Sequence, residues 1–208
     1  MTRACLAIET AFPRVGVSLE SGGSRHRPRT DLSARRANAL HAAVDELLRR
    51  AGLGVGDLER VLVDRGPGSY TGLRIGLATA RTLRELAGPC IRCLFSTDQL
   101  AWASRERLAP EEDFLVCMDA RRGHWYAARY RFERAGRLQR LTEPACVPRD
   151  QLEDLARGLE RLVTPGEAPG LDLALERVGF PPAESLFELE DLALESESPE
   201  PLYLLSPV

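Results

Sequence analysis

A glycine-rich turn between a short β-branched run and a helical pattern constrains this chain more than any other feature. Residues 60–64 read RVLVD, and residues 66–72 read GPGSYTG. From Leu73 the apolar residues recur at helical spacing until Gly88-Pro89 ends the pattern. Residues 60–88 therefore predict a strand, a tight loop and a helix.

The predicted helix has two apolar sides. One side carries Leu73, Leu77, Ala80, Leu83 and Ala87, and the opposite side carries Ile75, Ala78, Thr79, Thr82 and Leu86. Arg74, Arg81 and Glu85 form a narrow polar strip between them. A helix with two apolar sides needs two partners, so one side should cover the chain's own sheet. The other side should be either deep core or a contact surface for another subunit.

The glycine loop admits a phosphate-binding alternative, because amides at a helix N-terminus bind anions. Its spacing is G-x-G-x-x-x-G, however, and no Gly-Lys-Ser/Thr follows. The pattern favours a structural turn, made of Gly66, Pro67, Gly68, Ser69 and Gly72.

Composition excludes several classes of protein. At 208 residues the chain can hold one large domain or two small ones. A net charge of -3 argues against a generally basic nucleic-acid binder. All 28 cationic residues are arginine, which excludes any mechanism that uses a lysine. No apolar window approaches 18 residues and no signal-peptide pattern is present, so we expect a cytoplasmic protein that does not span a membrane.

The five cysteines are odd in number and scattered through apolar runs, which favours reduced thiols over a disulfide framework. Cys90-x-x-Cys93 follows Pro89 in a predicted strand, where residues three apart point to opposite faces, so we interpret this pair as structural. The three histidines, His26, His41 and His124, lack the spacing of a zinc site, and we expect His41 to be a partly buried structural residue.

The remaining segments predict an α/β protein. Residues 5–19 and 114–132 each show an apolar strand, an acidic residue, a turn and a second strand, so the second half repeats the plan of the first. Residues 21–32 predict an exposed connector or a weak edge strand, and an acidic run at 184–200 predicts a solvated face or mobile tail with a short helix that packs. Further helices are expected from the N-cap Ser33 to Gly52 and at 96–108, 149–159 and 171–178, and further strands at 90–95 and 161–163.

With these segments in place, the chain resembles a known family. The sequence RGPGSYTGLRIGLATA, the opening LAIETA, the later MDARRGHWYAARY and the closing PLYL resemble the bacterial TsaB (YeaZ) family over nearly the whole chain. This resemblance implies a two-lobed actin-like (ribonuclease H-like) fold with mixed β-sheets flanked by helices. The expected division is residues 1–98 as an N-terminal lobe with dimerisation helices and residues 99–208 as a partly degenerate C-terminal lobe.

The resemblance also implies a function. It implies a non-catalytic partner of the TsaD transferase, which forms threonylcarbamoyladenosine next to the anticodon of tRNAs that read codons starting with A. The implied partners are a TsaD homologue in a heterodimer, a second copy in a homodimer and the TsaE ATPase in the larger complex, with tRNA contacted only indirectly. Neither a cofactor nor a metal is expected. We expect the interface on helices 36–51 and 71–87, at Leu40, Ala43, Leu47, Arg74, Ile75, Ala78, Thr79, Thr82 and Leu86.

Departures from the family pattern favour a degenerate nucleotide site. Where actin-like ATPases and TsaB proteins keep an aspartate on the first strand, this chain has Glu9, and residues 164–170 read TPGEAPG without a clear adenosine-binding glycine pair. Where TsaD has a metal-binding H-x-x-x-H pair, this chain reads FSTDQLAWA, which leaves Asp98 alone. The candidates for the degenerate site are Glu9, Thr10, Asp119 and Arg121.

Three functional alternatives stay open, one at particular residues and two for the chain as a whole. Asp119 either caps the hairpin turn while Arg121 and Arg122 face water, or these residues hold an anion in a cleft between the lobes. The chain as a whole is alternatively an active actin-like ATPase or kinase, with Glu9 and Asp119 as its carboxylates. A metallopeptidase is the third and least favoured alternative.

Overall fold

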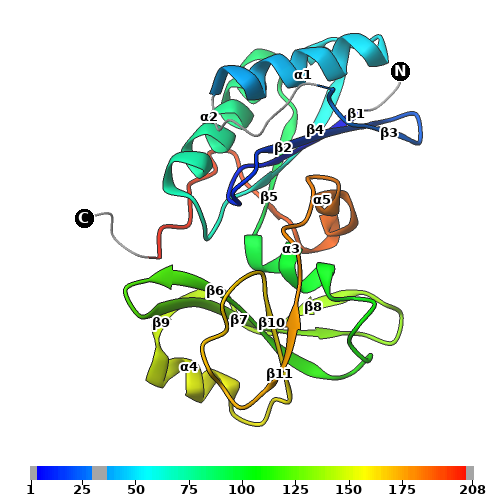
Figure 1. The fold of residues 1–208 in the computed structure, drawn as a ribbon. Coiled ribbons are helices and arrows are strands. Elements are labelled where there is room, and N and C mark those ends of the chain that lie inside the picture. The colour runs from blue at the N-terminus through cyan, green and yellow to red at the C-terminus, as the bar shows by residue number, and fades with distance from the viewer. Residues whose placement is uncertain (1–3, 30–36, 205–208) are drawn as a thin grey trace. The chain divides into compact units, whose positions relative to one another are not determined.

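The computed structural model describes residues 4–29 and 37–204 and divides them into two compact units (Figure 1). The first unit contains the described residues up to Ser96 together with residues 182–202, and the second contains residues 97–181 with Tyr203 and Leu204. The sequence suggested a single boundary after residue 98. The difference is that residues 182–202 return to the first unit, because their buried side chains and acidic groups pack on its sheet.

The first unit is built on a six-stranded mixed sheet with the order β12-β5-β4-β1-β2-β3. β1 pairs antiparallel with β2 and parallel with β4, and β4 pairs parallel with β5. The hairpin expected at residues 5–19 is therefore present. The elements of this unit are β1 (Ala4–Glu9), β2 (Gly16–Ser21), β3 (Ser24–His26), α1 (Ala37–Ala51), the 3-10 turn η1 (Val55–Asp57), β4 (Leu58–Asp64), α2 (Tyr70–Ala87), β5 (Cys90–Leu94), α5 (Ser185–Glu188), the 3-10 turn η2 (Glu190–Leu192) and β12 (Leu194–Glu195).

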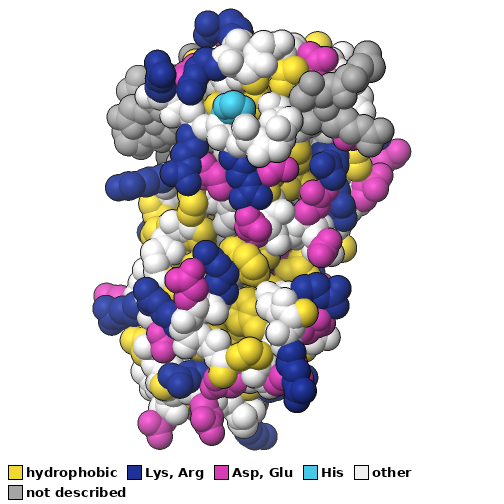
Figure 2. Space-filling model, turned by 90° about the vertical axis from the view of Figure 1, so that its right-hand side faces the viewer, with side chains coloured by type: hydrophobic (Ala, Val, Ile, Leu, Met, Phe, Trp, Pro, Cys, Tyr) yellow, Lys and Arg dark blue, Asp and Glu magenta, His cyan; other side chains and the backbone are white. Residues whose placement is uncertain are grey.

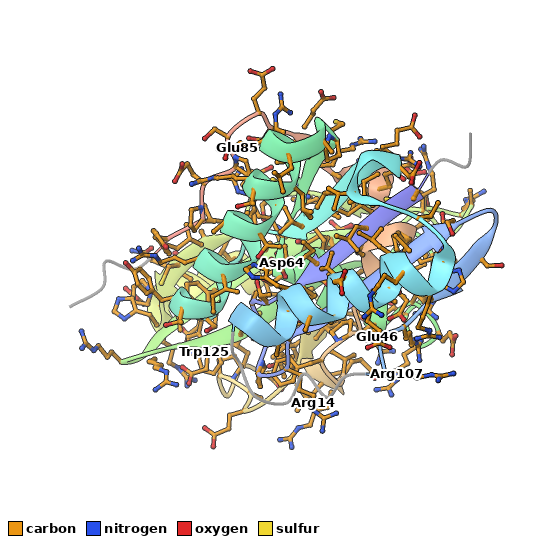
Figure 3. The ribbon with its side chains drawn as sticks, turned by 90° about the horizontal axis from the view of Figure 1, so that it is seen from above. Arg14, Glu46, Asp64, Glu85, Arg107 and Trp125 are labelled. Atoms are coloured by element: carbon orange, nitrogen blue, oxygen red, sulfur yellow. The ribbon has the colours of Figure 1, made fainter. Side chains whose placement is uncertain are left out.

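The two faces of this sheet have different covers. Helices α1 and α2 lie side by side on one face and α5 lies on the other (Figure 1; Figure 3 looks down onto α1 and α2). The helical side carries the apolar core, which joins β1, β2, β4 and β5 to α1 and α2 and includes Leu6, Ile8, Leu47, Val61 and Leu77. Ser33, the expected N-cap of α1, lies outside the described residues.

The first part of the acidic C-terminal run is paired and half-buried at Glu184 and Glu190, which corrects the expectation of a solvated face or mobile tail there, whereas Glu197 and Glu200 stay exposed. Glu190 accepts from Arg60 Nη1 at 2.8 Å and from Arg92 Nη1 at 3.2 Å, so one carboxylate joins β4 and β5. Glu184 pairs with Arg27 and Glu188 with Arg25. Arginine and acidic side chains are accordingly interspersed on the face drawn in Figure 2. The sequence shows the run but not its partners, because all four arginines are distant in the chain.

The second unit has a sheet with the order β11-β10-β6-β7-β8, and β9 also pairs with β7. β6 and β7 form the expected antiparallel hairpin, and β10 lies parallel to β6 as β4 lies parallel to β1. The predicted repetition of the first unit's plan is therefore confirmed for these strands. The elements are α3 (Ser96–Ala103, which begins in the first unit), β6 (Asp113–Arg121), β7 (His124–Phe132), β8 (Leu138–Arg140), β9 (Ala145–Pro148), α4 (Arg149–Ala156), β10 (Arg161–Thr164) and β11 (Ala174–Arg177).

Two helix predictions need correction. Residues 171–178 contain strand β11 instead of a helix, because Ala174–Arg177 pair in parallel with β10 at the edge of the sheet. Helix α3 ends at Ala103 rather than at residue 108, and turns follow it. Among the described residues, no helix has the length and apolar character needed to cross a bilayer.

Candidate partner-binding surface

Helix α2 has well-defined ends, which fix the two sides that it presents. Ser69 caps its N-terminus, where Gly72 N donates to Ser69 Oγ at 3.2 Å. Gly88 ends it in the left-handed conformation with a φ of 77°, and Gly88 N donates to Arg84 O at 2.7 Å. The sequence predicted both the glycine loop before the helix and the stop at Gly88.

The outer side of α2 is not deep core. Ala78, Thr82 and Leu86 are exposed, and Leu86 retains 71% of its surface. Leu86 and the two small residues Ala78 and Thr82 therefore form a largely apolar, solvent-exposed strip along the helix. At the start of the helix, Tyr70 is 42% exposed, and the Arg74 guanidinium lies 5.6 Å from the centre of its ring.

Not every predicted interface residue on α2 lies on this strip. Ile75 is half-buried against the core cluster, and Thr79 is buried. The Thr79 hydroxyl donates to Ile75 O at 2.9 Å, and His41 Nε2 lies 3.2 Å from the same hydroxyl. Because the only hydrogen of that hydroxyl is donated to the Ile75 carbonyl, the hydroxyl oxygen accepts a hydrogen bond from His41. This bond joins α1 to α2, and His41 is exposed rather than partly buried as expected.

The predicted interface residues on α1 are wrong. Leu40, Ala43 and Leu47 each have 0% exposure and belong to the core of the first unit. Helix α1 has a single apolar stripe, and the sheet takes all of it. Its exposed positions next to that stripe are occupied by His41, Ala42 and Asp45.

The glycine loop serves close packing. A side-chain Cβ at Gly68 would lie 2.6 Å from Ala11 O, and one at Gly72 would overlap the carbonyl oxygen of Thr10. A Cβ at Gly76 would overlap Thr10 Oγ1. Glycine at these positions lets the start of α2 approach the backbone of the turn between β1 and β2. These contacts support the structural interpretation of the loop.

Two buried carboxylates in the first unit hold backbone turns. Glu9 is 2% exposed, and its Oε1 accepts from Ala11 N at 2.7 Å and from Phe12 N at 3.1 Å. Asp64 is fully buried, and its Oδ1 accepts from Gly66 N at 2.6 Å and from Ser96 Oγ at 2.8 Å. Sequence reasoning missed Asp64, although an acidic residue at the end of a buried strand and before glycine signals such a turn.

The other two candidates for the degenerate nucleotide site lie in the second unit. Asp119 Oδ1 accepts from Arg121 N at 2.7 Å, and both residues are exposed. Arg121 and Arg122 have positive φ values of 69° and 54°, and Gly123 continues the turn with 75°. Asp119 therefore caps the hairpin turn and the two arginines face solvent, which supports the first of the two alternatives for this segment.

The comparisons with known proteins agree with this architecture. A family model described as tRNA N6-adenosine threonylcarbamoyltransferase, TsaD, matches residues 30–178. The threonylcarbamoyladenosine biosynthesis protein TsaB of Escherichia coli is 26% identical over 96% of this chain and 93% of that protein. TsaB of Bacillus subtilis is 37% identical over 58% of this chain and 48% of that protein. The solved structure of YeaZ from Pseudomonas aeruginosa has a TM-score of 0.79 at 22% identity, covering 97% of this chain and all of that one.

The chain belongs to the TsaB (YeaZ) family. The actin-like, ribonuclease H-like fold class predicted from the sequence is confirmed. Membership of this family places the chain in tRNA threonylcarbamoyladenosine biosynthesis.

A buried ion pair occupies the segment after β5 in this TsaB-family chain. Asp98 is fully buried at the start of α3, and Arg140 of β8 binds it in a bidentate manner, with Nε 2.9 Å from Oδ1 and Nη2 2.6 Å from Oδ2. The Tyr130 hydroxyl lies 2.8 Å from Asp98 Oδ1 and 2.7 Å from Thr97 Oγ1. The sequence identified Asp98 as isolated, because Tyr130 and Arg140 reach it only through the sheet.

The electrostatics of this network follow from burial. Burial and the adjacent Asp98 carboxylate raise the pKa of Tyr130 well above its usual value, so the phenol stays protonated. Burial alone would lower the pKa of Arg140, but its hydrogen bonds to Asp98 and the negative charge of that carboxylate together outweigh burial, so the pKa is raised. The network is therefore a neutralised, hydrogen-bonded unit that anchors α3 to the sheet of the second unit.

The cysteines of this TsaB-family chain are free thiols, as the sequence predicted. Burial raises the pKa of Cys5 and of Cys117 to about 12, and that of Cys93 to about 11. Cys90 is half-buried while Cys93 is buried, as expected for a pair on opposite faces of a strand. Within residues 4–29 and 37–204, no three side chains of His, Cys, Asp or Glu lie close enough together to bind a metal ion.

Proposed function

We propose that this chain is the non-catalytic partner of a TsaD-type threonylcarbamoyl transferase and that it docks through the outer side of α2. The observation that supports this proposal is the apolar strip of Ala78, Thr82 and Leu86 on a helix whose other side is already buried in its own core. The chain's own described residues leave this strip uncovered, and a folded partner is the simplest cover for it.

The proposal of a TsaD-type partner, rather than an unrelated protein, has a physical argument. A family model for TsaD matches 30–178, a range that contains all of α1 and α2. Two related chains therefore present similar helix pairs, and helices pack by fitting ridges of side chains into grooves between small residues. The Ala78 and Thr82 positions provide such a groove, and Leu86 provides a ridge beside it.

The non-catalytic part of the proposal is supported by how the carboxylates are used. Both Glu9 and Asp119 accept hydrogen bonds from the backbone of their own turns. Glu9 is the stronger case, since moving its carboxylate to a hydrated magnesium ion would leave the buried amides of Ala11 and Phe12 without an acceptor. The ATPase or kinase alternative requires both carboxylates to be released from these bonds.

Introducing a charged side chain into the apolar strip of α2 tests the docking proposal. We expect Ala78→Glu to abolish binding of the TsaD homologue and self-association, because a carboxylate would be buried without a partner. Leu86→Ala should weaken binding about tenfold, for a loss of about 1 to 2 kcal/mol of apolar burial. Ala135→Glu, the same change at another exposed alanine, in the turn after β7, is the matched control and should leave binding unchanged.

The measurements are pull-down and light scattering with the purified TsaD homologue, with far-UV circular dichroism to confirm that each variant is folded. Normal pairing of a folded Ala78→Glu variant would refute the assignment of the surface. Self-association without binding to the TsaD homologue would identify a second copy as the occupant instead.

Reconstituted tRNA modification tests the role itself. We expect the TsaD homologue with TsaE to form threonylcarbamoyladenosine only when this chain is present, while the isolated chain does not turn over ATP. Rapid ATP turnover by the isolated chain would instead favour the enzyme alternative.

A further inference from the structure

The C-terminal segment of the first unit consists of two parts that are held by different forces. Residues 182–193 carry apolar anchors, since Ala183, Leu186, Leu189 and Ala193 are all buried. Residues 194–202, here called the distal strap, contain Pro199 as the one buried residue of the nine. Leu194, which begins the distal strap, is 46% exposed. Apolar burial therefore fixes the first part and contributes little to the second.

Backbone hydrogen bonds attach the distal strap to the edge of the sheet. Its first two residues form β12, which pairs antiparallel with β5. Ser196 N donates to Ile91 O at 3.0 Å, and further along Leu202 N donates to Arg65 O at 2.8 Å. Because β12 is the outermost strand next to β5, these few bonds are what covers the β5 edge.

Ionic contacts attach the same residues to the flank of α2. Arg81 Nε donates to Pro199 O at 3.1 Å, and Arg81 Nη2 lies 2.6 Å from Glu200 Oε1. Arg84 Nη2 lies 3.2 Å from Glu197 Oε1. The carboxylate side chains are 69% and 90% exposed, respectively, so water and salt ions reach both pairs. Figure 1 shows this segment, in red, running beside α2.

Attachment of this kind is weak and sensitive to salt. Exposed ion pairs contribute little to stability and are screened as ionic strength rises. Segments with few buried apolar contacts and solvent-accessible hydrogen bonds are those that open without global unfolding. The distal strap has both properties, whereas the sheet strands beneath it are buried.

We propose that the distal strap is an ionic latch that opens while the rest of the first unit stays folded. Opening removes β12 from the β5 edge and frees Arg81 and Arg84 on α2. The surface exposed in this way is complementary to the segment that left it, because it offers an unpaired strand edge beside two arginines. It fits an extended, acidic segment of a partner protein that pairs with β5 and places carboxylates at the two arginines. The proposal is independent of what binds the outer side of α2.

Hydrogen exchange of the full-length protein tests the opening. Exchange is compared by mass spectrometry at about 0.05 M and about 1 M NaCl, between which the Debye length falls from more than 10 Å to about 3 Å. Amides of the distal strap are expected to exchange at least about tenfold faster at high salt, because their ion pairs are screened, while those of β4 change less than about twofold. Equal rates for the distal strap and β4 at both salt concentrations would overturn the proposal, since the segment would then open only on global unfolding.

Charge reversal separates an ionic latch from a merely exposed segment. The double variant E197R/E200R should expose the distal strap at low salt, and adding R81E/R84E should restore its protection. Failure of the four-fold variant to restore protection, with circular dichroism showing that it is folded, would contradict the ionic origin of the latch. A double variant as well protected as the wild type would contradict it equally.

A peptide added in trans tests the exposed surface. A fluorescein-labelled peptide with the sequence of residues 193–204, ALESESPEPLYL, should bind the E197R/E200R protein and be released by salt. The wild-type protein should bind it at least about tenfold more weakly, because its own distal strap occupies the surface. No binding to the E197R/E200R protein would overturn the assignment of the β5 edge as a site for acidic segments.

Discussion

Replacing Gly72 with alanine should destabilise the first unit, although glycine-to-alanine changes inside helices normally stabilise. The added Cβ would overlap the carbonyl oxygen of Thr10, well inside the 3.0 Å that such atoms keep from their neighbours. This oxygen belongs to the backbone of a turn that Glu9 holds with two hydrogen bonds. The oxygen therefore cannot rotate away, and the start of α2 has to shift by roughly an ångström.

The expected loss of stability in Gly72→Ala is the difference between two opposing effects. Alanine in place of glycine in a helix gains about 1 kcal/mol, whereas overpacking a rigid contact costs about 1 to 3 kcal/mol and sometimes more. With a backbone atom as the obstacle we expect the upper end of that cost, so the net loss is about 2 kcal/mol. For a chain of this length this lowers Tm by about 4 to 8 °C.

Gly76 provides a matched comparison, because its obstacle is a side chain. A Cβ there would overlap Thr10 Oγ1, a buried hydroxyl that has no hydrogen-bond partner among the described residues. Gly76→Ala should therefore be rescued by Thr10→Ala, which removes the obstacle. Gly72→Ala should not be rescued by the same change, since the backbone oxygen remains.

Thermal melts followed by far-UV circular dichroism measure these effects. Both tryptophans, Trp102 and Trp125, lie in the second unit, so their fluorescence reports on that unit separately. Gly56→Ala, where an added Cβ meets nothing within 4 Å, is the control and should stay within about 0.5 kcal/mol of the wild type. A Gly72→Ala protein that melts at or above the wild-type temperature would refute the packing argument, and so would its rescue by Thr10→Ala.

Three further outcomes are expected from the buried polar groups. Tyr130→Phe should cost about 1 to 3 kcal/mol in urea unfolding followed by tryptophan fluorescence, because it removes a buried hydroxyl from a hydrogen-bonded network; an unchanged midpoint would contradict the network's contribution. Burial raises the pKa of Cys5 and Cys117 from 9.0 to about 12, so between these pH values the thiols ionise only in the unfolded state. The free energy of unfolding should therefore be unaffected by these thiols below pH 9 and fall above it by about 1.4 kcal/mol per pH unit for each thiol. A free energy of unfolding that stays constant from about pH 9 to 11 in denaturant titrations would contradict this. With an aromatic disulfide reagent at pH 8, Cys90 and Cys146 should react in the native protein and the other thiols only after unfolding, and rapid labelling of all five would count against the described burial.

Local patterns in the sequence were enough for the elements that interact with their neighbours in the chain. The hairpins β1–β2 and β6–β7 each show an apolar run, a turn and a second strand that alternates, and α2 has a capping serine, a helical period and a terminal glycine. These signals depend on backbone geometry within a few residues, so they survive without knowledge of the fold. The same holds for the structural interpretation of Cys90 and Cys93.

Errors arose where the outcome depends on what lies across the sheet. Leu40, Ala43 and Leu47 form an apolar stripe that a partner or the chain's own sheet could equally cover, and the sheet covers it. The spacing of residues 171–178 fits a short helix as well as a strand, and pairing with β10 decided in favour of the strand.

The sequence by itself predicted the α/β class, the glycine loop followed by a two-sided helix, the reduced thiols and the membership of the TsaB family, because each of these is carried by local motifs or by residue counts that need no knowledge of contacts across the fold. Only the tertiary structure decided that the acidic C-terminal run belongs to the first unit and that Asp98 is neutralised by Arg140. The physical reason is that a charge acts on whatever lies within a few ångströms in space, and the arginines that meet these carboxylates are 42 to more than 150 residues away along the chain.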